Sequence, residues 1–180
     1  VTRPSGGSWS SPQMLVSAAS SPARMAVSAA GEVHLTWHNT GARSEIFYMR
    51  REIGGTWTPV ENLTAQEYAG ASANPEIAVD QAGTVHIAWK NGIGFYARKT
   101  ITGTWSGPVG TTIWPFLVDE TRLSVDPAGT AHVAWLGSTQ AVFEGVIYAR
   151  IKEGVVETTQ LVRATGAPTR LGAITADDSG

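Results

Sequence analysis

The chain has 180 residues, only 16% of them charged, and a formal net charge of −2. This balance provides no strong positive field, so nucleic acid is not an expected partner. The absence of cysteine excludes disulfides, thiol catalysis and cysteine metal ligands, and no apolar run approaches the ~20 residues that a membrane-spanning helix needs.

One phrase occurs three times along the chain. It reads Gly31-Glu-Val-His-Leu-Thr-Trp37, then Gly83-Thr-Val-His-Ile-Ala-Trp89, then Gly129-Thr-Ala-His-Val-Ala-Trp135. A second phrase, Gly-x-Trp, ends at Trp9, Trp57 and Trp105, at equal intervals of 48 residues. A repeat of this length is typical of stacked supersecondary units.

Each unit has the pattern of short strands. Val85, Ile87 and Trp89 alternate with His86 and Ala88, a period of two rather than 3.6. Turn phrases such as 80–83 join aspartate to a glycine that accepts a left-handed conformation. In the second unit this predicts four strands, at about 75–80, 84–89, 94–100 and 105–112.

Taken in chain order, these patterns predict one segment over 1–180. It comprises a lone fourth strand over 8–17, complete units over 22–64, 74–112 and 121–162, and a lone first strand over 169–180. Four short strands per unit of about 40–50 residues is the pattern of a β-propeller blade. We therefore expect an all-β propeller segment of about three and a half repeats. Its open ends would be covered by the remaining blades of a larger ring or by self-association.

The connections between strands differ in length at one edge only. The stretch from the second to the third strand varies between units, and so does the stretch from the fourth strand to the next unit. Both connections lie on the same edge of an up-and-down sheet. We expect that edge to be the functional face, because binding residues concentrate on variable loops.

The repeating histidines and aromatic residues are interpreted as structural. His34, His86 and His132 occupy equivalent positions one unit apart, so they would not converge on a zinc ion, whose bonds are only ~2 Å long. We expect each to bond a backbone or aspartate partner between units, and the repeated tryptophans and tyrosines to fill the core. We predict no metal site, no cofactor and no catalytic residue.

The candidate ligand-binding residues are those that break the repeat. Arg24, Glu76 and Arg122 occupy matching positions near the start of each first strand, where inner strands converge. They either contact one acidic or polyhydroxylated ligand together or form a buried ion pair that joins adjacent units. The variable connections around them add His38, Arg43, Tyr68, Trp114, Phe116, Asp119 and Glu120. Trp114-Pro-Phe116 suits sugar stacking or an interface with a neighbouring domain equally well.

A family resemblance adds to these predictions. The run 75–89, the phrase Phe95-Tyr-Ala-Arg98 and the phrase Gly103-Thr-Trp105-Ser-Gly-Pro108 resemble the repeats of bacterial sialidase-like, or BNR-type, β-propellers. The family's aspartate box, Ser-x-Asp-x-Gly-x-Thr-Trp, is absent in that form. The resemblance implies a propeller fold and an extracellular or periplasmic location, and it does not select an activity.

Three functions follow as hypotheses. The first is a recognition or scaffold module that binds carbohydrate or protein through the variable face without turnover. The second is a sialidase-like glycoside hydrolase or polysaccharide lyase whose site is shared with further blades. The third is a structural repeat that completes a ring by self-association.

Overall fold

The computed structural model describes residues 6–17, 20–41, 43–65, 70–111, 117–138, 144–162 and 170–177. The fold is all-β, as predicted. The described residues form twelve strands in three four-stranded antiparallel sheets, and they contain no helix. A closed ring is not formed by the part of the chain that the structure describes.

The strands follow the chain order within each sheet. Sheet 1 contains β1 (Arg24–Val27), β2 (Val33–His38), β3 (Ile46–Arg51) and β4 (Glu61–Asn62). Sheet 2 contains β5 (Ala73–Val79), β6 (Val85–Asn91), β7 (Ile93–Lys99) and β8 (Val109–Gly110). Sheet 3 contains β9 (Leu117–Val125), β10 (Ala131–Ser138), β11 (Glu144–Lys152) and β12 (Val155–Val162). The fourth strands β4 and β8 are shorter than expected.

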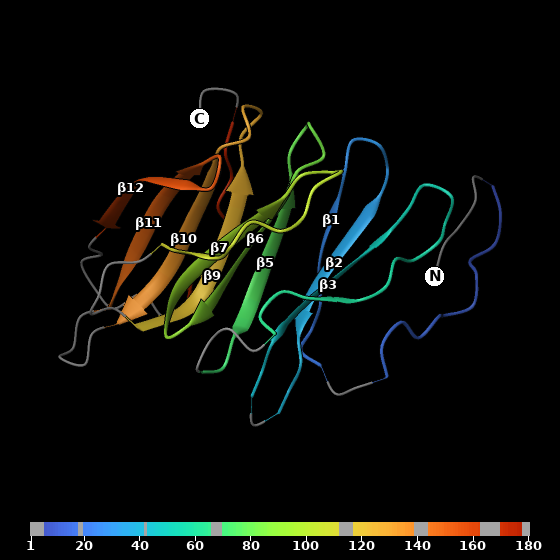
Figure 1. The fold of residues 1–180 in the computed structure, drawn as a ribbon, viewed down its shortest axis with the longest axis horizontal. Helices are drawn as coiled ribbons and strands as arrows, with labels where there is room; N and C mark the ends of the chain where they lie inside the picture. Colours follow the sequence, from blue (N-terminus) through green and yellow to red (C-terminus); the bar gives the residue numbers. More distant parts are fainter. Residues whose placement is uncertain are drawn as a thin grey trace.

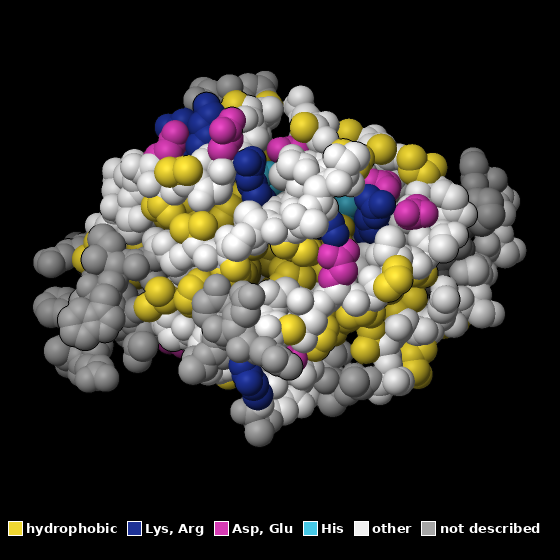
Figure 2. Space-filling model, viewed as in Figure 1, with side chains coloured by type: hydrophobic (Ala, Val, Ile, Leu, Met, Phe, Trp, Pro, Cys, Tyr) yellow, Lys and Arg dark blue, Asp and Glu magenta, His cyan; other side chains and the backbone are white. Residues whose placement is uncertain are grey.

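The three sheets succeed one another across the molecule (Figure 1), and their first strands β1, β5 and β9 contact one another in that order. Apolar side chains fill the two spaces between sheets. Ile46 and Tyr48 of sheet 1 pack with Ile87 and Trp89 of sheet 2. A second cluster joins sheet 2 to Val133, Trp135, Ile147 and further residues of sheet 3. Figure 2 shows acidic and basic side chains side by side on one face of the molecule, in agreement with the near-zero net charge.

The repeated histidine belongs to a buried hydrogen-bonded chain inside each sheet. In sheet 2, His86 Nδ1 lies 2.7 Å from Tyr96 Oη and His86 Nε2 lies 3.4 Å from Asp80 Oδ2. In sheet 3, His132 makes the same contacts with Tyr148 and Asp126. The predicted structural role is thus observed, but the partners come from the same sheet and not from a neighbouring one.

The aspartates of this chain also shape the turns. Asp80 Oδ1 accepts a hydrogen bond from Thr84 N at 2.7 Å, and its carbonyl accepts one from Gly83 N at 3.1 Å. Gly83 has a φ of +81°, which glycine adopts without strain. Burial acts to raise the pKa of Asp80, yet the hydrogen bonds from His86 and Thr84 lower it overall.

Sheet 1 departs from this pattern because Ser28 stands where sheets 2 and 3 have aspartate. Ser28 Oγ accepts a hydrogen bond from Glu32 N at 3.1 Å, as the aspartate does for the turn. It is too short to reach the histidine. His34 still bonds Tyr48 at 2.8 Å through Nδ1, while its Nε2 is buried without a hydrogen-bond partner.

A polar contact locks sheet 1 to sheet 2. Trp105 packs edge-on against Tyr48 with ring centroids 5.1 Å apart, and its Nε1 donates to Glu61 Oε2 at 2.8 Å. Lys99 Nζ lies 2.7 Å from both oxygens of Glu61. It also lies 5.7 Å from the Trp105 ring centroid. Trp105, from the repeated glycine–tryptophan phrase, therefore joins sheet 2 to sheet 1.

The two end segments lie where lone strands were expected, but neither has strand structure. Residues 8–17 form no strand, and Trp9 is 65% exposed, so the prediction that Trp9 belongs to the core is wrong. Residues 170–177 run beside β9, where Ala176 N donates to Ser124 Oγ at 3.1 Å. A strand needs a hydrogen-bonded neighbour, and among the described residues these segments have no ladder partner.

The two tryptophan positions predict different effects on stability. Trp105→Ala should lower the free energy of unfolding by about 3 kcal/mol, because the intersheet packing and the Glu61 hydrogen bond are lost. Trp9→Ala, in the same repeat phrase, should change it by no more than about 0.5 kcal/mol, because the side chain is exposed. Chemical denaturation would measure both, and equal effects would contradict the assignment of Trp105 to the intersheet lock.

Stability should also fall as the solution becomes acidic. Burial lowers the pKa of His34 and, together with Lys90, that of His38 from an ordinary value of about 6.5. Below that pH the unfolded histidines bind protons while the folded ones stay neutral, so each contributes a slope of at most about 1.4 kcal/mol per pH unit. Denaturation between pH 7.5 and the lower folded pKa values should show this loss, and His34→Gln/His38→Gln should flatten it.

Candidate functional site

Arginine and glutamate alternate across the first strands of the three sheets. Arg24 on β1 donates from Nε to Glu76 Oε1 on β5 at 3.0 Å, and Arg122 Nη1 on β9 lies 3.4 Å from the same oxygen. Glu120 Oε2 lies 3.5 Å from Arg122 Nη2, and Arg170 Nε lies 3.7 Å from Glu120 Oε1. We refer to these five residues as the inner-strand cluster. The three residues expected to converge do so.

The members of the cluster differ in their remaining capacity to bind a ligand. Arg122 donates to three backbone carbonyls, those of Thr121 at 2.7 Å, Leu171 at 3.0 Å and Gly172 at 2.7 Å. This arginine therefore fastens the segment 170–177 to β9. The side chain of Arg24 is 49% exposed and that of Arg170 is 85% exposed, so these two present guanidinium groups to solvent.

Irregularities in two neighbouring strands shape the surface beside the cluster. The register of β5 shifts between Ala73 and Glu76, and that of β9 against β10 shifts beside Asp119. Asn74 has a φ of 53° at the first shift, and its Nδ2 donates to the carbonyl of Asp119 at 2.8 Å. Lys90 Nζ lies 3.3 Å from Asp119 Oδ1. β-Bulges and left-handed asparagine are frequent next to functional sites.

Two small hollows open beside these bulges and share Arg24 and Asn74. One, of about 160 Å³, lies among the members of the inner-strand cluster and Thr121. The other, of about 220 Å³, is lined by His38, Ser21, Pro22 and Pro75 in addition. The Nδ1 atom of His38 is buried there without a hydrogen-bond partner. Burial, assisted by Lys90, lowers the pKa of His38, which favours the neutral imidazole.

The remaining predicted residues are placed as follows. Arg43 is exposed in the connection between β2 and β3 and lines neither hollow. Tyr68, Trp114 and Phe116 lie outside the described residues. Sequence reasoning missed Asn74, Pro75, Ser21 and Arg170. The Asn-Pro step inside an otherwise regular strand was the available signal for the bulge, because proline interrupts a ladder.

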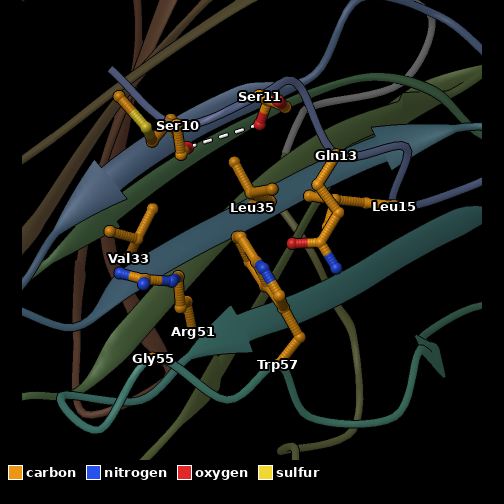
Figure 3. Close-up of a pocket in the computed structure, with 10 residues that line it drawn as sticks. Ser10, Ser11, Gln13, Leu15, Val33, Leu35, Arg51, Gly55 and Trp57 are labelled. Carbon is orange, nitrogen blue, oxygen red and sulfur yellow. Dashed lines mark hydrogen bonds between the residues drawn. The ribbon is translucent and has the colours of Figure 1, made fainter. Parts of the chain in front are cut away.

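A larger pocket lies against sheet 1, under the segment 8–17 (Figure 3). Its volume is about 650 Å³, and Trp57, Leu35 and Val33 form its apolar floor. Gln13 and Leu15 come from the covering segment, and Arg51 lies at the rim. The predicted candidate residues that the structure describes do not line it. Trp57 occupies the same repeat position in sheet 1 as Trp105 does in sheet 2. The pocket therefore lies on the face of sheet 1 that corresponds to the face of sheet 2 packed against sheet 1.

The described residues hold no group of three or more histidines, aspartates or glutamates arranged to bind a metal ion. A helix long and apolar enough to cross a membrane is likewise not found among them.

Comparison with known proteins identifies no family. No protein-family model matches the chain, and no curated protein matches it. Among solved structures, it is similar to a protein of unknown function from Dyadobacter fermentans, with 12% sequence identity and a TM-score of 0.43. That similarity covers 83% of this chain and 70% of the other.

Removal of Arg122 should release the segment 170–177. Arg122→Gln keeps a polar side chain but loses the fork that holds the carbonyls of Leu171 and Gly172, so amide hydrogen exchange at 170–177 should rise. Arg24→Gln is the control, since Arg24 makes no hydrogen bond with that segment among the described residues. Unchanged protection in Arg122→Gln would contradict the proposed fastening.

Proposed function

We propose that this chain is a β-propeller segment whose role is recognition, and that it binds carbohydrate or protein through the inner-strand cluster without turnover. The observation that carries the proposal is the alternating row of Arg24, Glu76, Arg122, Glu120 and Arg170, which crosses all three sheets beside two hollows. The repeated sheets, with their first strands in contact, support the propeller assignment.

Carbohydrate is the first ligand class to test. Arg24 and Arg170 offer exposed donors, and Glu76 and Glu120 offer acceptors. This mixture matches a ligand with many hydroxyl groups and an acidic substituent, because guanidinium groups bind carboxylates strongly. The resemblance to sialidase-like repeats adds the proposal of an extracellular or periplasmic location.

The contacts within the inner-strand cluster favour recognition over catalysis. Glu76 and Glu120 are both engaged by arginines, and Arg122 is engaged by backbone carbonyls. The hollows are small and lie between exposed cations. These contacts favour a surface that holds a ligand by hydrogen bonds and charge.

The test is a glycan array that contains neutral and acidic glycans, followed by calorimetry with any glycan that binds. Arg24→Ala and Arg170→Ala should each weaken binding by about tenfold or more, because a hydrogen bond to a charged group contributes about 1.5–3 kcal/mol. Arg43→Ala, an exposed arginine outside the hollows, is the matched control. A silent array combined with hydrolysis of a fluorogenic sialoside would overturn the proposal in favour of the glycoside hydrolase. Binding unaffected by the arginine variants would place the ligand elsewhere.

A further inference from the structure

The larger pocket on sheet 1 (Figure 3) has a counterpart inside the molecule that is already filled. Trp57 and Arg51 line the pocket, and their repeat equivalents in sheet 2 are Trp105 and Lys99. The backbone arrangement is the same in both places, since Arg51 forms an isolated β-bridge with Trp57 and Lys99 forms one with Trp105. The contacts of the filled counterpart therefore indicate what the open pocket can bind. We call the open one the Trp57 pocket.

The filled counterpart holds an aromatic ring and a carboxylate, both supplied by sheet 1. The Tyr48 ring lies edge-on to Trp105, with ring centroids 5.1 Å apart. The Glu61 carboxylate accepts hydrogen bonds from Trp105 Nε1 at 2.8 Å and from Lys99 Nζ at 2.7 Å. An indole N–H and a cation thus bind one carboxylate, while the indole ring contacts a neighbouring aromatic ring.

In the Trp57 pocket the corresponding groups lack such partners. Among the described residues, the Arg51 side chain makes no ion pair and no hydrogen bond, and Glu52 pairs with Arg50 instead. Trp57 Nε1 likewise donates to no group that the structure describes. Arg51 Nη2 would lie 2.9 Å from a Cβ built on Gly55, so the guanidinium rests against this turn at the pocket wall. The pocket therefore offers an indole N–H and a positive charge without a counter-charge.

The Trp57 pocket has the size and lining of a small-molecule site. Its volume of about 650 Å³ lies within the roughly 300–1,000 Å³ of typical ligand cavities. Val33, Leu35 and Met25 provide apolar surface, and Gln13 and Leu15 of the segment 8–17 lie over it. This segment leaves a cavity in place of an open sheet face, so a small molecule fits better than a further sheet.

We propose that the Trp57 pocket binds a small aromatic carboxylate. The carboxylate accepts hydrogen bonds from the Arg51 guanidinium and from Trp57 Nε1, and the ring lies against the indole and the apolar floor. Guanidinium groups bind carboxylates through charge-assisted hydrogen bonds, and aromatic rings favour edge-to-face packing. The pocket shares no residue with the inner-strand cluster, and its ligand is independent of the function proposed above.

NMR of the indole N–H groups tests the proposal, since the chain contains seven tryptophans whose signals can be followed separately. The isotope-labelled protein would be titrated with benzoate, phenylacetate and cinnamate in turn. At least one should shift the Trp57 signal, assigned with Trp57→Phe, saturably and leave that of Trp105 unchanged, because Glu61 already holds the Trp105 N–H. The amide of the probe that binds keeps the ring but lacks the charge, and it should bind about tenfold more weakly or worse.

Variants of Arg51 test the role of the charge. Arg51→Gln should weaken binding of the carboxylate by about tenfold or more and remove its advantage over the amide, because the charge-assisted hydrogen bonds are lost. Arg51→Lys should retain that advantage, since a lysine holds the carboxylate in sheet 2. Arg43→Gln is the matched control, because Arg43 is exposed and does not line the pocket.

Four results would overturn the proposal. No probe shifts Trp57 up to its solubility limit, or the amide binds as tightly as the carboxylate. Binding that is unchanged in Arg51→Gln would place the carboxylate elsewhere. A Trp57 shift that grows with protein concentration in the absence of any probe, together with dimers in light scattering, would show that a second copy covers this face instead. Arg24→Ala should leave the Trp57 response unchanged, so a failure here is distinguishable from a failure on the glycan array.

Discussion

The rest of the structure depends on one constraint, that a sheet apolar on both faces must be covered on both faces. Sheet 2 satisfies it completely, because sheet 1 packs on one side and sheet 3 on the other. The strand β6 is accordingly buried over Val85–Trp89. At the outer face of sheet 1, Met25 is 64% exposed and Val27 is 56% exposed. Each sheet is thus stabilised mainly by its neighbours, as in other repeat architectures.

The strands that the sequence predicted well are those with regular alternation and aspartate–glycine turns. The fourth strands were predicted too long for a physical reason. Pro59 and Pro108 each lie between a bridge formed by the tryptophan and the two-residue strand that follows, β4 or β8. Proline cannot donate to a ladder, so the pairing is interrupted there. The strand β12 contains no proline and extends over Val155–Val162. The repeated glycine–tryptophan phrase did not predict how long each fourth strand would be, because it marks where the strand segment begins and not where prolines interrupt it.

The site was predictable in part. Equal positions in three neighbouring first strands were sufficient to bring Arg24, Glu76 and Arg122 together. The ion pairs between adjacent sheets are observed, whereas a shared ligand stays a prediction. Arg122 is a fastener, whereas Arg24 keeps half of its side chain in solvent. The bulge at Asn74 was not predictable, because its position depends on the contact with the Asp119 carbonyl in the next sheet. Nor did sequence alone reveal that Ser28 leaves His34 Nε2 unpaired, since the consequence appears only when the three sheets are superposed by their repeat.

The lock formed by Lys99, Glu61 and Trp105 has a consequence for the order of the units. Glu61 pairs with Tyr48 across β3 and β4, and the residue in the same position of sheet 2 is Val109, opposite Tyr96. If the second unit were duplicated, Lys99 of the later copy would face Val109 of the earlier copy. Its ammonium group would then lack the carboxylate that Glu61 provides. Although the units are similar, the contact between sheets 1 and 2 is specific to their order, and a chain with rearranged units would lose the Lys99–Glu61 ion pair even if each four-stranded sheet stayed intact.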